Sequence, residues 1–236
     1  MTLRPVAGRR GILDPADAWA EVRSGPPWVA PTTLLSAEDT ANTGGGSVYP
    51  LSTLDELGRG AWERDLHTHL DGARLFNAVV ESGVPAERRC RHWESVAFCL
   101  SKGLGAPAGS VLCGPADFIL RGRRLRKMLG GAMRQAGYLA AAGLYALEHN
   151  VERLAGDHRR ARALYEGLLG TGWAAEAPET NMVYVRGDGA SATVEALAER
   201  GVLAVPVGPG RMRLVTHLDI DDDAVEQVIE VFRGLR

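Results

Sequence analysis

Cysteine is scarce in this sequence, with three residues among 236, and the three are neither evenly paired nor closely spaced. Cys90, Cys99 and Cys113 therefore suit neither a disulfide framework nor the paired ligands of a metal site. Cys99 and Cys113 lie inside apolar runs, so we expect both to be small core residues in a reducing compartment. We accordingly expect no metal site and a cytoplasmic location.

Long apolar runs are also absent, since none reaches the roughly 18 residues that a membrane-spanning helix requires. Residues 1–5 lack the apolar core of a signal peptide, which again favours the cytoplasm and argues against a membrane partner. Neither sign of charge dominates, because 27 basic and 29 acidic side chains give a net charge of −2. This balance argues against a nucleic-acid partner, and we interpret the basic stretch at residues 121–127 as a solvated helix face.

The composition that remains, 45% hydrophobic and 24% charged, is that of an ordinary globular protein of one or two domains. Strand and helix patterns alternate over the first two thirds of the sequence, which predicts a mostly parallel sheet. We expect strands at residues 33–37, 66–70, 94–100 and 110–113, and helices at residues 52–65, 74–82, 116–128 and 133–155. The last helix carries alanine and leucine on more than one face, so we expect it to be buried.

The remaining residues predict a smaller α+β unit. We expect helices at residues 159–169, 190–200 and 221–235, and strands at residues 181–185, 202–207 and 211–217. The boundary falls near Ala155, within a helical region. The sequence therefore predicts two domains, residues 1–155 and residues 156–236.

The strongest chemical signal is Lys102, which directly follows the apolar run at residues 94–100. Gly103, Gly105 and Gly109 predict a tight turn at the end of a strand, where ligands bind in open α/β sheets. An amine that bonds to an aldehyde must be held rigidly and partly desolvated, and this position suits such a lysine. The alternative is a solvated surface lysine. The glycines do not match a dinucleotide-binding fingerprint, because their final spacing is wrong.

Three more polar residues cluster at the end of the strand expected at residues 66–70. Asp71 follows this strand, so it caps the next helix, faces a ligand, or does both. Arg74 lies one helical turn after Asp71, and His69 lies two residues before it on an extended segment, so both are expected on the same side. Lys102 is 31 residues beyond Asp71 (102 − 71 = 31), enough for one crossover helix between neighbouring strands.

These motifs, with three blocks further along, resemble the threonine aldolase family within the beta-eliminating lyases. The blocks are residues 126–137, 180–182 and 213–219, and the resemblance extends from about Pro31 to the C-terminus. It implies an α/β fold, namely an incomplete large domain of the PLP-dependent transferase (aspartate aminotransferase-like) type with a mostly parallel sheet, plus a small C-terminal α+β domain. Members normally carry about a hundred further residues before the point where this sequence begins, so the resemblance implies an N-terminally shortened chain.

The resemblance also assigns roles to single residues. It implies that Lys102 forms an aldimine with pyridoxal 5'-phosphate (PLP) and that Asp71 keeps the pyridine nitrogen protonated. It implies that Arg74 and Arg213 hold the carboxylate of an amino acid substrate, which a guanidinium can bind in bidentate fashion. His69 is expected to support the cofactor.

The cofactor phosphate is expected to contact Arg134 of a neighbouring subunit, with Lys127 close by. The N–H groups of Gly130 and Gly131 are further candidates for anion binding. We interpret His217 as a structural residue. The resemblance therefore implies a homo-oligomer, a dimer or tetramer, with shared active sites.

The implied activity is that of a PLP-dependent lyase of glycine biosynthesis and threonine catabolism. It would cleave L-threonine, L-allo-threonine or a related β-hydroxy-α-amino acid to glycine and an aldehyde. The alternative is a truncated, inactive relative or fragment of the same fold, with open sheet edges and exposed apolar surface. Two departures bear on this choice. Ala41 stands where the family often has a histidine, and the portion that grips the phosphate in relatives is missing.

Overall fold

The computed structural model describes residues 2–187 and 190–235, and the chain divides into two compact units. Unit 1 comprises Met1–Gly44 and Val48–Val151, and unit 2 comprises Gly45–Ser47 and Glu152–Arg236. This division follows compactness alone. The existence of two domains that fold independently stays a prediction.

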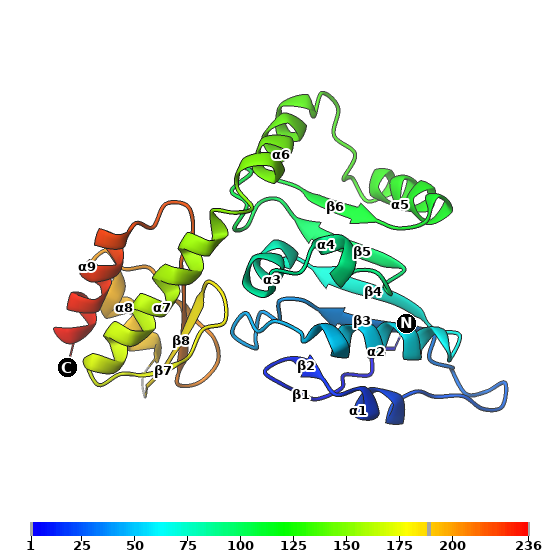
Figure 1. Ribbon diagram of the computed structural model, residues 1–236, viewed down its shortest axis with the longest axis horizontal. Coiled ribbons are helices and arrows are strands. Elements are labelled where there is room, and N and C mark those ends of the chain that lie inside the picture. The colour runs from blue at the N-terminus through cyan, green and yellow to red at the C-terminus, as the bar shows by residue number, and fades with distance from the viewer. Residues whose placement is uncertain (1, 188–189, 236) are drawn as a thin grey trace. The chain divides into compact units, whose positions relative to one another are not determined.

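Unit 1 is built on a four-stranded sheet in the order β3-β4-β5-β6 (Figure 1). The strands are β3 (Leu34–Glu38), β4 (His67–Gly72), β5 (Ser95–Cys99) and β6 (Ser110–Cys113). The first three are parallel, and β6 runs antiparallel to β5. The predicted mostly parallel sheet is therefore confirmed. Each predicted strand is present, and its ends differ from the prediction by two residues at most.

Helices connect the parallel strands, as the alternating pattern predicts. The connections are α2 (Leu51–Trp62) between β3 and β4, and α3 (Leu75–Ser82) and α4 (Ala86–Arg89) between β4 and β5. Leu54 and Leu57 of α2 are fully buried and join the apolar core of unit 1 together with Leu70 of β4. Burial of one such leucine stabilises the fold by roughly 1.5–3 kcal/mol.

Two small elements precede the sheet. β1 (Gly8–Arg9) and β2 (Ile12–Leu13) form an antiparallel hairpin, and α1 (Pro15–Ala20) follows. The Asp14 carboxylate accepts a hydrogen bond from the N–H of Ala16 at 2.8 Å, which caps α1.

Two helices follow β6, α5 (Ala116–Met128) and α6 (Gly137–His149). The prediction of one buried helix over residues 133–155 is wrong. The helix ends at His149, and α7 begins only at Leu154. Tyr138 is 92% exposed on α6, because nothing in the described part of the chain packs over that side. Cys113 is exposed for a similar reason, since β6 is an edge strand, so its predicted burial is also wrong.

Unit 2 has an antiparallel sheet in the order β7-β8-β10-β9. Its strands are β7 (Ala174–Glu176), β8 (Met182–Arg186), β9 (Val205–Pro206) and β10 (Arg211–Val215), and its helices are α7 (Leu154–Gly170), α8 (Ala190–Ala198) and α9 (Asp222–Arg233). Helices α7 and α9 contact each other, and Leu168 and Phe232 are fully buried between elements of this unit. The predicted α+β character is therefore confirmed, although β7 is not among the predicted strands.

Candidate active site

The carboxyl ends of the three parallel strands of unit 1 lie along one edge of the sheet, called here the carboxyl edge. The register aligns Glu38 of β3 with Asp71 of β4, and Asp71 with Ala97 of β5. Lys102 lies five residues beyond Ala97 (102 − 97 = 5), on the turn by which the chain leaves β5. The topology therefore brings Asp71 and Lys102 to the same edge on adjacent strands, where open α/β sheets bind ligands.

Hydrogen bonds hold the turn that carries Lys102. The N–H of Gly105 donates to the carbonyl of Lys102 at 2.9 Å, and the φ of Gly105 is +77°, a conformation that glycine adopts without strain. Leu104 is buried beneath the turn, and its carbonyl accepts a hydrogen bond from the Asn150 side chain at 2.7 Å. These two hydrogen bonds therefore fix the backbone of the turn that carries Lys102.

The side chain of Lys102 is exposed, so the partial desolvation expected from the sequence is wrong for this structure. The reason is the position of the turn at the surface, where Ser101 and Pro107 are exposed as well. Only cover from another segment or molecule would desolvate this amine.

Asp71 caps no helix. Its carboxylate accepts a hydrogen bond from the N–H of Ala73 at 3.0 Å, which is a local turn, and α3 begins only at Leu75 with no side-chain cap. The alternative reading of Asp71 as a helix cap is therefore wrong. Asp71 is exposed, and one of its carboxylate oxygens accepts the hydrogen bond of this turn.

Arg74 lies beside Glu38 at the same edge. Its side chain is 13% exposed, and its Nη1 is 4.0 Å from the Glu38 Oε1. The backbone at Arg74 has φ −131° and ψ 32°, so the residue precedes the helix and the helical argument that placed it beside Asp71 does not apply. A largely buried guanidinium at the strand ends remains suited to binding a carboxylate.

The tautomer of a neutral His69 follows from its hydrogen bond to Ser95 of β5. The Ser95 hydroxyl donates to the carbonyl of Thr68 at 3.1 Å, so its oxygen accepts from the His69 Nδ1, 2.9 Å away. A neutral His69 ring then carries its proton on Nδ1 and has Nε2 as an acceptor. This residue was expected to support the site, and the hydrogen bond to Ser95 fixes its ring.

A buried ion pair that sequence reasoning missed supports the carboxyl edge. The Arg89 guanidinium donates to the Asp39 carboxylate at 2.6 and 3.0 Å, and both side chains are almost completely buried. Arg89 also donates to the carbonyl of Tyr49, whose N–H donates to Asp39. The one signal in the sequence is the position of Asp39 directly after β3, because its partner lies 50 residues away.

Arg134 and Lys127 are exposed, and both lie beyond β6 in the sequence. β6 runs antiparallel to β5, so it ends on the side of the sheet opposite the carboxyl edge. Their predicted contact with the phosphate, Arg134 from a neighbouring subunit, stays a prediction.

The predicted anion-binding amides after α5 are already used. The N–H of Gly131 donates to the carbonyl of Arg126 at 2.8 Å, and the N–H of Gly130 donates to that of Lys127 at 3.2 Å. The expectation that these two N–H groups bind an anion is therefore wrong for this conformation, because both close the end of the helix.

Arg213 and His217 belong to unit 2, so the structure does not test their relation to Lys102. Arg213 lies on β10, opposite Tyr184 of β8, and is half-buried. The His217 Nδ1 lies 3.6 Å from the Asp219 Oδ2. The substrate-binding role of Arg213 stays a prediction.

Metal chemistry receives no support from the described residues, which contain no group of three or more His, Cys, Asp or Glu side chains able to hold an ion. Likewise, none of the helices in the described ranges combines the length and apolar character needed to cross a bilayer.

Comparisons with a family and with individual known proteins agree on the family of this chain. Residues 1–188 match the family described as beta-eliminating lyase. The chain is 45% identical over 209 residues to the low specificity L-threonine aldolase of Escherichia coli K12, covering 87% of this chain and 61% of that protein. It is 44% identical over 214 residues to a probable low-specificity L-threonine aldolase of Arabidopsis thaliana, covering 86% of this chain and 60% of that protein. The chain thus spans about 60% of the length of these curated relatives.

The structural comparison agrees at the level of the fold. The threonine aldolase structure from Leishmania major superposes with a TM-score of 0.79 at 22% identity, covering 97% of this chain and 68% of that one. The α/β fold is therefore shared, and it is partial relative to this neighbour.

Proposed function

Because the chain belongs to the beta-eliminating lyase family, we propose that its carboxyl edge is the PLP site of a threonine aldolase. The reaction would cleave L-threonine or a related β-hydroxy-α-amino acid to glycine and an aldehyde. The observation that carries this proposal is the meeting of Lys102 and Asp71 on adjacent strand ends. Similarity to two low-specificity L-threonine aldolases supports the substrate class.

The residues present fit two of the three groups of the cofactor. Lys102 offers an amine on a rigid turn to the aldehyde, and Asp71 has a carboxylate oxygen available for the ring nitrogen. The phosphate has no comparable partner among the described residues of this edge. When bound, PLP supplies an electron sink for the bond that is broken.

The remaining chemistry belongs to side chains of the chain itself. Arg74 would bind the carboxylate of the substrate, and this would draw its guanidinium away from Glu38, 4.0 Å away. The Asp71 carboxylate would accept a hydrogen bond from the protonated ring nitrogen and so favour its protonated form. His69 would present its Nε2 as a proton acceptor, because its Nδ1–H donates a hydrogen bond to the Ser95 hydroxyl oxygen.

The test is the absorbance of the imine that forms between protein and cofactor. Purified chain mixed with PLP is expected to develop this band, and Lys102→Ala is expected to lose it. The matched control is Lys127→Arg, which removes the other lysine amine of the sequence but keeps its positive charge, so the band should remain. A band that survives Lys102→Ala, or no band in the unchanged chain, would contradict the proposal. Threonine cleavage measured as aldehyde release then tests the reaction itself.

A specific observation favours a second candidate, an inactive relative. Lys102 is exposed rather than desolvated, and the chain spans about 60% of the length of its curated relatives. In this case the chain would show neither the imine band nor aldehyde release.

We also propose a homo-oligomer with shared sites, since Arg134, which is expected at the cofactor phosphate, is exposed and could reach a neighbouring copy of the chain. Light scattering of the purified chain tests this: a dimer or tetramer is expected, and a strict monomer would contradict it.

A further inference from the structure

A pocket lies at the amino ends of β4 and β5 in unit 1, at the edge of the sheet opposite the carboxyl edge. It has a volume of about 580 Å³ and is lined by three segments, namely residues 58, 59 and 62 of α2, residues 65–68 at the start of β4, and residues 91–94 before β5. Sites for small molecules usually measure roughly 300–1,000 Å³. We call it the amino-edge pocket, and it is large enough for a small organic ligand.

Local contacts hold the three walls of the amino-edge pocket together. The N–H of Glu94 donates to the Thr68 hydroxyl oxygen at 2.7 Å, and the Ser95 hydroxyl donates to the carbonyl of Thr68 at 3.1 Å. An added Cβ at Gly58 would lie 2.6 Å from the Cβ of His92. Glycine at this position therefore lets α2 approach the segment before β5 closely, and the pocket is formed without a ligand.

Two tryptophans line the amino-edge pocket. Trp62 lies four residues after Gly58, hence on the same face of α2, and is 80% exposed. Trp93 is 6% exposed, and its indole N–H has no hydrogen-bond partner among the residues that the structure describes. Large aromatic side chains gain stability when another ring stacks on them. The walls therefore suit a planar aromatic ligand.

The acidic groups in and beside the pocket are mostly paired already. The Glu94 Oε2 lies 2.7 Å from the His67 Nδ1. Asp55, which precedes the pocket on α2, accepts two hydrogen bonds from the Arg88 guanidinium at 2.6 and 2.7 Å. Asp65 is exposed and forms no salt bridge within the described ranges. One carboxylate of the lining is therefore left unpaired.

Two guanidinium groups of the lining are unpaired as well. Arg59 donates its Nε–H to the carbonyl of Asp55 at 3.2 Å, and Arg91 is exposed before β5. Neither forms a salt bridge with any residue that the structure describes. A guanidinium binds a carboxylate or a phosphate in bidentate fashion. Two unpaired cations against the single carboxylate of Asp65 favour a ligand with an anionic group.

We propose that the amino-edge pocket binds a planar aromatic ring that carries an anionic group, as in a nucleotide or an aromatic carboxylic acid. The ring lies against Trp62, and Arg59 and Arg91 bind the anionic group. The pocket lies at the opposite edge of the sheet from Lys102 and Asp71. The proposal therefore does not depend on the chemistry proposed for those two residues.

The experiment titrates the full chain with adenosine 5'-monophosphate (AMP) and, separately, with benzoate. Proton–nitrogen NMR follows the indole N–H groups of the five tryptophans, and Trp62→Phe and Trp93→Phe assign the two that line the pocket. At least one ligand is expected to shift both of these resonances. Binding by AMP identifies the nucleotide source, and binding by benzoate alone identifies the aromatic acid.

Four further probes separate the ring from the anionic group. Adenosine and benzyl alcohol lack the anion, and inorganic phosphate and acetate lack the ring. Each is expected to bind at least about tenfold more weakly than its parent ligand, since a charge-assisted hydrogen bond contributes at least that factor. A partial probe that binds as tightly as its parent would overturn the proposal.

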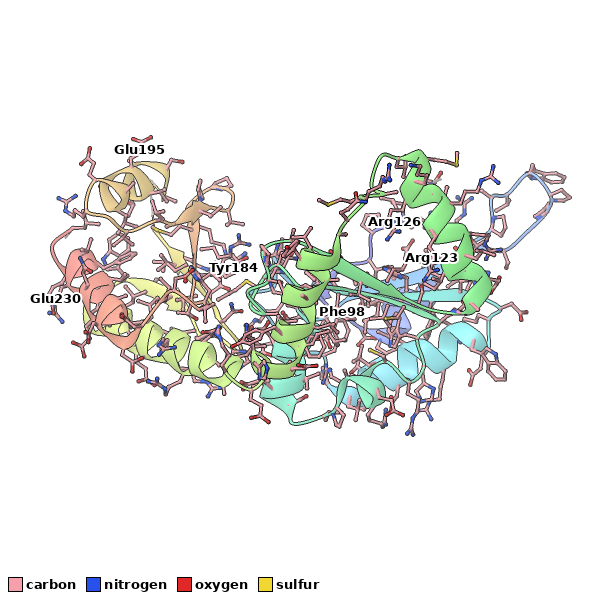
Figure 2. All side chains as sticks on the ribbon, turned by 90° about the horizontal axis from the view of Figure 1, so that it is seen from above. Phe98, Arg123, Arg126, Tyr184, Glu195 and Glu230 are labelled. Atoms are coloured by element: carbon pink, nitrogen blue, oxygen red, sulfur yellow. The ribbon has the colours of Figure 1, made fainter. Side chains whose placement is uncertain are left out.

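Matched variants locate the ligand. Trp62→Ala and Arg91→Gln, both at exposed positions, are expected to weaken binding about tenfold. The controls are Trp28→Ala, at a position that is 84% exposed, and Arg123→Gln on α5 (Figure 2), which lie outside the pocket and should bind as the unchanged chain does. Lys102→Ala should also bind normally, which separates this site from the proposed cofactor site. No shift with either ligand, full binding by both pocket variants, or loss of binding in Lys102→Ala would each overturn the proposal.

Discussion

Burial separates the three cysteines at the scale of single residues. Cys113 is exposed on the edge strand β6, whereas Cys90 and Cys99 are half-buried. Burial raises the pKa of the Cys90 thiol to about 11, and the nearby Asp39 carboxylate adds to the shift. Because the thiolate is the reactive form, Cys90 should not react under conditions in which Cys113 does.

A disulfide reagent added to the folded protein at about pH 8 should therefore modify Cys113 first. At that pH only about one Cys90 thiol in a thousand is ionised. Cys113→Ser is expected to remove the fast phase, and Cys90→Ser should leave it unchanged. Raising the pH toward the shifted pKa should accelerate Cys90, and equal rates for both cysteines at the lower pH would refute the assignment.

The buried pair of Asp39 and Arg89 makes a different residue-scale prediction. Arg89→Met would leave the Asp39 carboxylate buried without its partner, so a loss of roughly 3–5 kcal/mol in the free energy of unfolding is expected. The control is Arg121→Met, which removes a pair with Asp117 that is more than 70% exposed and should cost about 1 kcal/mol or less. Urea unfolding of the three proteins measures both, and similar losses for the two variants would contradict the difference in burial.

At the scale of elements, helix ends decide where the chain turns. Helix α3 ends at Gly83, whose φ of +67° is left-handed and whose N–H donates to the carbonyl of Val79. An added Cβ would meet no atom within 4 Å there. The need for glycine at this position is therefore conformational and not steric.

Gly83→Ala is expected to destabilise the protein by about 1 kcal/mol, because the Cβ of alanine makes the left-handed conformation unfavourable. Gly137→Ala is the matched control within unit 1. Gly137 begins α6, has no atom near an added Cβ, and has ordinary helical geometry, so alanine should be neutral or slightly stabilising. Thermal melting of both variants tests the pair, and equal effects would show that the φ angle is not the cause.

At the scale of the whole molecule, two separate cores suggest two unfolding events. Leu197 is fully buried in the core of unit 2, and Trp173 is the only tryptophan of that unit, with its indole N–H donating to the carbonyl of Phe232 at 3.0 Å. The other four tryptophans lie in unit 1. Trp173 can therefore report on unit 2 against a background of unit 1.

Leu197→Ala should lower the stability of unit 2 by roughly 2–5 kcal/mol through loss of packing and the cavity left behind. The fluorescence of Trp173 during unfolding in denaturant is obtained by subtracting the signal of Trp173→Phe. In the Leu197→Ala variant its midpoint should shift to a lower denaturant concentration, while the midpoint of the other tryptophans should not change. If all signals move together, the two units unfold as one and the predicted domains are not independent.

Much of the fold could be predicted because local pattern and strand order are linked by simple rules. The apolar run before Lys102 and the acid after residues 66–70 predict two strand ends, and the parallel arrangement places those ends at one edge. The turn at Lys102 could be predicted from its glycines. The sequence could not predict that Asp71 forms a local turn or that Arg74 lies outside the helix, because both depend on where α3 begins.

Periodicity, spacing and motif are enough to predict most of the helices and strands, the family, and the common edge of Lys102 and Asp71. The exposure of Lys102 and Cys113, the pairing of Asp39 with Arg89 across 50 residues, and the exposed face of α6 become visible only in the folded chain. The physical reason is that burial and long-range pairing depend on what packs against a residue. An apolar helix can encode a contact whose partner lies outside the described chain.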